Sequence, residues 1–259
     1  MRMMKKVLGT VTVLALSVSL LAGCGSTAVS PVSSTASTAA ESTTSSVVSE
    51  TTSAAADENE AAAAQLLNDL TGSYQELWPV ILADEYKQTW LDDCTALVGE
   101  DNAEAAFEKL SSMVTGDVYG EDAVKAYANG GGAYFCGFTN SLATLTFDGE
   151  TSTISGTDKD GNVLFSHTYH YIGMEPVRGL YEFQSDDADS GEFTYFFLAP
   201  DTSAETYHIE FRYGSDAEAL SQYDTGEYAY WVASGISTDC DQTMIDNCIE
   251  LFCTENLAG

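Results

Sequence analysis

The sequence has three histidines, whose imidazole side chains can bind a metal ion or transfer a proton near neutral pH: His167, His170 and His208. Glu210 follows His208 by two positions, so strand alternation would place both side chains on one face. The segment around His170 is also a predicted strand. If the faces of the two strands line the same cavity, His170, His208 and Glu210 can converge there. Imidazole and carboxylate are common zinc ligands, so this pattern predicts a divalent metal site. In the alternative interpretation, Glu210 pairs with Arg212 and His208 is an isolated polar residue.

The sequence contains no catalytic signature to accompany these histidines. It has no G-x-S-x-G, H-E-x-x-H or P-loop motif, and no G-x-G-x-x-G that follows a strand. The glycine run 130–132 follows a predicted helix and precedes a predicted strand, the reverse of the order in phosphate-binding loops. We therefore expect a protein that is not an enzyme.

The N-terminus has the three parts of an export signal. Arg2, Lys5 and Lys6 precede an apolar run over residues 7–21, which is short for a membrane-spanning helix. The run ends in the sequence L-A-G-C, with the cysteine at Cys24. This segment resembles the bacterial lipobox, which implies cleavage after residue 23 and lipid modification of Cys24.

Composition then divides the chain into three parts. Residues 1–23 are the predicted signal peptide, and residues 24–56 are the lipidated Cys24 followed by a disordered tether rich in Ser, Thr and Ala. Residues 57–259 form the predicted folded domain. We expect this domain to be extracytoplasmic, at the bacterial cell surface, and held to the membrane by the lipid on Cys24.

The charge of the chain excludes some partners. Removal of the signal leaves six basic against 40 acidic residues, a net charge of −34. Such a surface repels nucleic acid, so no nucleic-acid partner is expected. Besides Cys24 the chain has five cysteines, an odd number: Cys94, Cys136, Cys240, Cys248 and Cys253. Buried free thiols and one or two disulfides are both compatible with this count.

Periodicity predicts an α+β fold that is mainly antiparallel β. Helices are expected over 60–70, over 73–94 with a break at Pro79, after a capping box at Asp101–Glu104, over 121–129 and over 244–252. Seven short strands are expected at 134–138, 142–147, 151–155, 163–171, 179–184, 193–198 and 207–213. Strands at this spacing favour an antiparallel barrel or sandwich with flanking N-terminal helices and a C-terminal helix.

Residues 70–251 resemble the ZinT/YodA family of extracytoplasmic zinc-binding proteins. The motifs that carry the resemblance are L-T-G-S-Y-Q-E-L-W-P at 70–79, V-R-G-L-Y-E-F at 177–183, A-P at 199–200, E-T-Y-H-I-E-F at 205–211 and G-S-D-A-E-A-L at 214–220. The resemblance implies a lipocalin-like (calycin) barrel that binds or traffics zinc.

The family binds zinc through three histidines, and only one has a counterpart here. The first family position is Phe196, the second is Thr206, and the third is His208. The divergence leaves two other functions open. One is a calycin barrel whose metal site has degenerated and which binds a small apolar ligand, because Phe196 would suit a dry cavity. The other is a non-catalytic interaction protein of the cell envelope.

Overall fold

The computed structural model describes residues 47–199 and 208–258, with side chains from residue 58 onward. The predicted signal peptide, Cys24, the tether up to residue 46 and Thr206 lie outside the described residues. The helix α1 (Val47–Asp69) begins inside the segment predicted as a tether and continues past residue 57, the predicted start of the domain. In the described part of the chain, no helix combines the length and the apolar character that crossing a bilayer requires.

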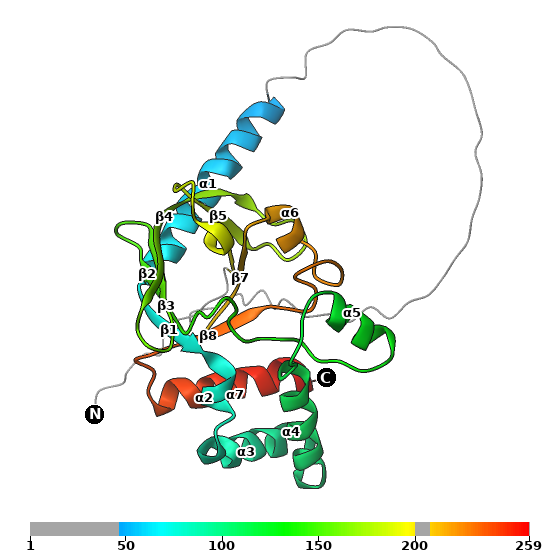
Figure 1. Cartoon of the computed structure of the whole chain (residues 1–259). Helices are drawn as coiled ribbons and strands as arrows, with labels where there is room; N and C mark the ends of the chain where they lie inside the picture. The colour runs from blue at the N-terminus through cyan, green and yellow to red at the C-terminus, as the bar shows by residue number, and fades with distance from the viewer. Residues whose placement is uncertain (1–46, 200–207, 259) are drawn as a thin grey trace, which may run out of the picture. The chain divides into compact units, whose positions relative to one another are not determined.

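Eight antiparallel strands form a closed barrel in which each strand pairs with the next along the chain (Figure 1). The strands are β1 (Gly72–Glu76), β2 (Thr144–Asp148), β3 (Thr153–Thr157), β4 (Val163–Met174), β5 (Tyr181–Ser185), β6 (Tyr195–Leu198), β7 (His208–Gly214) and β8 (Ala233–Ser237). The ring closes where β8 pairs with β1. This up-and-down barrel confirms the predicted fold class of an antiparallel, lipocalin-like barrel with flanking helices.

Two of the eight strands were not expected from the sequence, and one expected strand is absent. Residues 73–76 were predicted to be helical, but they belong to β1. The strand β8 was not predicted. The segment 134–138, predicted as a strand, contributes only the isolated bridges of Phe135 to Thr115 and Trp231. The other six predicted strands correspond to β2 to β7.

Most of the helices lie between β1 and β2 in the chain, and single helices precede β1, precede β8 and follow β8. Besides α1, they are α2 (Leu77–Ile81), α3 (Lys87–Val98), α4 (Glu100–Val114), α5 (Glu121–Ala128), α6 (Ala217–Leu220) and α7 (Gln242–Leu257), with short 3-10 turns η1 (Asp84–Tyr86) and η2 (Gly191–Phe193). Figure 1 shows α2, α3, α4 and α7 together, and α3 contacts both α4 and α7. The predicted capping box is wrong, because α4 already begins at Glu100 behind the cap residue Gly99.

The interior of the barrel is packed with aromatic and aliphatic side chains. Phe196 is fully buried, and its ring lies 5.4 Å from that of Tyr213 and 5.9 Å from that of Phe165. A Cβ atom at Gly156 would come within 2.4 Å of the side chains of Leu142 and Phe165, so only glycine fits there. The described side chains of the barrel interior therefore pack closely against one another.

A second apolar core lies among the helices on the outside of the barrel. It contains Trp78, Trp90, Leu110 and Ile249, together with four cysteines: Cys94, Cys136, Cys248 and Cys253. The indole of Trp90 donates a hydrogen bond to the Ile81 carbonyl at 2.7 Å, which fixes the end of α2 against α3. This helical core packs against β8 through Ile236, and Leu77, Trp78, Ile81 and Cys248 of the core line the site described next.

Candidate functional site

The strand β7 presents two different faces. Ile209, Phe211 and Tyr213 point into the barrel and are at most 1% exposed. Alternation places His208 and Glu210 on the outer face, where α2 and α7 pack against the barrel. The sequence prediction that His208 and Glu210 share a face is therefore correct, and the face is the outside of the barrel.

These two side chains border a small pocket between β7, α2 and α7. Its lining combines apolar and aromatic side chains with polar ones: Leu77, Trp78, Ile81, His208, Glu210, Cys248, Leu251, Phe252 and Glu255. The rings of Trp78 and Phe252 meet edge to face, with centroids 4.8 Å apart. The pocket thus places one imidazole, two carboxylates and one thiol around an aromatic surface.

The electrostatics of the pocket follow from burial next to acidic groups. Burial raises the pKa of the Cys248 thiol to about 12, and the nearby Glu210 carboxylate adds to this increase. Burial and then Glu210 likewise raise the pKa of Cys136 to about 12. Both thiols are therefore protonated at neutral pH, and a cation that used Cys248 as a ligand would first displace a proton.

His170 lies elsewhere on the barrel. Its Nδ1 is 2.6 Å from Asp186 Oδ1, at the turn after β5, and the pair is exposed to solvent. His170 is opposite Gln184 on β5, whereas His208 is opposite Ile236 on β8. The structure thus brings His208 and Glu210 together and places His170 with Asp186. In the part of the chain that the structure describes, no three His, Cys, Asp or Glu side chains are grouped so that they could hold one metal ion.

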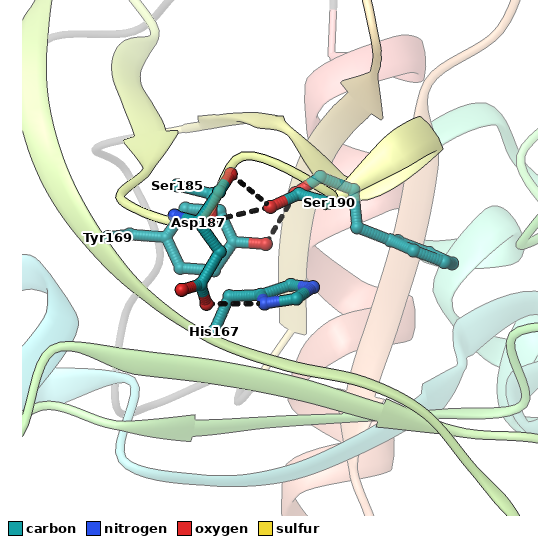
Figure 2. A network of polar contacts seen from close by, with 6 residues as sticks. His167, Tyr169, Ser185, Asp187 and Ser190 are labelled. Atoms are coloured by element: carbon teal, nitrogen blue, oxygen red, sulfur yellow. Dashed lines mark hydrogen bonds and ion pairs between the residues drawn. The ribbon is translucent and has the colours of Figure 1, made fainter.

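His167, in the middle of β4, takes part in a second polar network with residues at the end of β5 and the turn that follows it (Figure 2). Its Nδ1 lies 2.7 Å from Asp187 Oδ2. The hydroxyl of Ser190 is 2.7 Å from Ser185 Oγ and 2.9 Å from the Asp187 carbonyl oxygen. Figure 2 shows that the contacts drawn for the serines run to each other and to the Asp187 main chain, while the imidazole contacts the carboxylate. The serines hold the turn and do not form a nucleophile–base pair with His167.

The histidine set implied by the family resemblance does not fit this chain. Phe196, at the first family position, is buried in the aromatic core of the barrel. Thr206, at the second position, lies outside the described residues. His208, at the third position, borders the outer pocket. Because one imidazole binds zinc weakly on its own, no step of a three-histidine zinc chemistry can be assigned here.

Several residues of these sites were missed from the sequence. Cys248 and Glu255 come from α7, and helical spacing alone does not reveal which strand a helix covers. Asp186 and Asp187 offered a usable signal, since two consecutive carboxylates directly follow β5, the strand that pairs with His170 of β4.

No protein-family model matches the chain, and no curated protein matches it. Among solved structures, the Zn(II)-bound ZinT-like domain of Streptococcus pneumoniae AdcA is similar, at 15% identity and a TM-score of 0.45, over 71% of this chain and 89% of that chain. The Zn(II)-bound AdcA of the same organism is similar at 14% identity and a TM-score of 0.42, over 70% of this chain and 34% of that chain. Both contain the domain whose family the sequence motifs resemble, and the bound Zn(II) is a property of those proteins.

Proposed function

We propose that this chain is an extracytoplasmic, lipid-anchored binding protein that takes up a divalent cation of the zinc class in the pocket between β7, α2 and α7. The observation that carries the proposal is that His208, Glu210, Cys248 and Glu255 all line one small pocket, where as placed they do not form a group that could hold a metal ion. His208 and Glu210 are fixed on one strand face, and Glu255 comes from the last turn of α7. Side-chain rotation of Glu255 would complete a set of three donors.

The size of the pocket favours an ion over an organic ligand. Its free space is about 30 Å³. This is room for a water molecule or a single ion, whereas a drug-sized ligand needs on the order of 300 Å³ or more. A cation fits both this volume and the two carboxylates in the lining.

The charge of the whole chain supports the same ligand class. With 40 acidic and nine basic residues, the protein attracts cations to its surface and repels anions. Binding through an adjustable set with one imidazole would be weaker than binding through three histidines. Reversible uptake suits a protein that buffers or passes on a cation, and the lipid at Cys24 would keep it at the membrane.

The test is a calorimetric titration of zinc into residues 25–259 with all cysteines reduced. We expect saturable one-to-one binding that His208→Ala weakens at least about tenfold, because it removes the only imidazole of the pocket. Glu210→Gln, which keeps the shape and removes the charge, should weaken binding as well. Binding should also strengthen from pH 6 to pH 8, because a cation displaces protons from imidazole and thiol.

The matched control is His170→Ala, which removes one histidine on β4. It should leave the affinity unchanged, and Cys94→Ala should do the same for a thiol outside the pocket. If His170→Ala weakens binding as much as His208→Ala, the three-residue site expected from the sequence is correct and the pocket as described is not. Absence of saturation up to about 1 mM zinc, or full affinity in His208→Ala, contradicts the proposal.

A further inference from the structure

Cys94 and Cys253 meet inside the helical core. Cys94 lies on α3 and Cys253 on α7, and both are fully buried. Their sulfur atoms are 3.9 Å apart. Of the five cysteines in the described residues, this is the pair whose sulfurs are in contact, while Cys136, Cys240 and Cys248 are separate thiols.

The geometry points to a disulfide between Cys94 and Cys253 in the exported protein, which fastens α3 to the helix that borders the cation pocket. A disulfide needs sulfur atoms about 2.05 Å apart. Rotation of the two side chains and a small approach of the helices can remove the difference from 3.9 Å. The bond would close a loop of about 160 residues, and constraint of the unfolded chain increases with loop length.

The chemistry requires an external disulfide, which an oxidising compartment supplies. The thiolate of one cysteine attacks a reagent disulfide, forms a mixed disulfide and releases one thiolate. The second cysteine then attacks the first, and the other half of the reagent leaves as a thiolate. Two protein thiols are thus oxidised by two electrons, one reagent disulfide is reduced to two thiols, and the protons of the cysteines pass to the leaving thiolates.

The timing follows from burial. Burial raises the pKa of both thiols, so little thiolate exists once the helices have packed. Neither sulfur is reachable by a reagent in the folded protein. The exchange therefore takes place while the chain folds after export. The inference uses the export part of the proposed function and does not depend on cation binding.

The experiment is a peptide map of the full-length chain, collected from cells that export it, alkylated while denatured and digested without reductant. We expect the peptides that contain Cys94 and Cys253 to be joined and those with Cys136, Cys240 and Cys248 to be alkylated. Recovery of Cys94 and Cys253 as alkylated peptides, or joined to other cysteines, overturns the inference. As a control, the chain without residues 1–24 remains in the reducing cytoplasm and should carry both as free thiols.

Thermal unfolding gives a second measurement. Exported protein that is denatured, reduced and refolded in reductant should have a Tm about 5–10 °C below that of the untreated protein, because reduction removes a constraint on the unfolded chain. Cys94→Ala should lose this response to reductant, whereas Cys248→Ala, a buried cysteine on the same helix as Cys253, should keep it. An exported wild-type protein whose Tm is the same with and without this treatment also overturns the inference. Neither readout involves zinc, so failure of cation binding would leave both measurements unchanged.

Discussion

The molecule has two apolar cores that differ in chemistry. The barrel core is built on stacked aromatic rings such as Phe165, Phe196 and Tyr213. The helical core contains four cysteines, and beside it the Asp93 side chain has a buried carboxylate oxygen without a hydrogen-bond partner. The barrel core is a packed support, and the groups able to bind or react lie between the barrel and its helices. The pocket proposed to bind a cation lies on the outside of the barrel.

The largest expected effect tests whether the barrel is packed as tightly as this contrast requires. Phe196→Ala removes a fully buried ring that contacts other aromatic rings on several sides. We expect the free energy of unfolding to fall by about 3–5 kcal/mol, measured by urea denaturation. Val163→Ala, at a position that is 70% exposed, should change it by less than about 0.5 kcal/mol.

Phe196→His tests the same contrast between the two cores. It places a histidine at the position where the family that the sequence resembles has its first zinc ligand. A buried imidazole without a partner should destabilise the fold and bring no gain in zinc affinity, since His208 points to the outside. The contrast between the two cores would break down if this variant remained stable and bound zinc more tightly than the wild type.

A smaller effect of opposite sign is expected in the helical layer. Burial, and then the charge of Glu250, raise the pKa of Asp93. The folded state therefore favours the protonated acid. Its contribution to stability is fully present below the ordinary pKa near 4 and is lost as pH rises through the folded pKa.

Asp93→Asn should thus stabilise the protein at pH 7 by about 1 kcal/mol, with little effect near pH 3. Urea denaturation at the two pH values measures this difference. Asp92→Asn, an exposed neighbour on α3, provides the comparison and should be nearly neutral at both. Equal stabilisation by Asp93→Asn at pH 3 and pH 7 would show that charge is not the cause.

The smallest effect is expected on the rim of the barrel. Asp186→Asn removes the carboxylate that contacts His170 at 2.6 Å, but both side chains are more than half exposed. Exposed ion pairs contribute about 0–1 kcal/mol, so the loss in a denaturation experiment should be below about 0.5 kcal/mol. A loss comparable to that of Phe196→Ala would mean that the rim, and not the aromatic core, holds the barrel together.

Sequence patterns predicted the strands that are rich in aromatic and β-branched residues and missed the others. The sequence of β8 is A-S-G-I-S. Small residues of this kind are also common in turns, so the segment was not recognised as a strand. Residues 73–76 stand next to an apolar helical run, so helical periodicity was extended over a strand. Both missed strands become recognisable only through their partner, since β1 and β8 pair with each other.

The candidate site was predictable in part for a related reason. Alternation placed His208 and Glu210 on one face, which depends only on local geometry. Whether that face is the inside or the outside of the barrel depends on the apolar residues between them, and Ile209 and Phe211 face inward. The distance between His170 and His208 depends on the order of strands around the ring, which a linear pattern does not contain.

The pairing of β1 with β8 has a consequence for how the chain folds. Tyr74 is opposite Ser237, so the two strands that close the ring stand near opposite ends of the folded segment. The last seam cannot form until almost the whole chain has been synthesised, and contacts of such wide sequence separation form slowly. Before that moment β1 offers an unpaired edge to any extended segment nearby. The late seam therefore leaves an interval after synthesis in which the incompletely folded chain can aggregate.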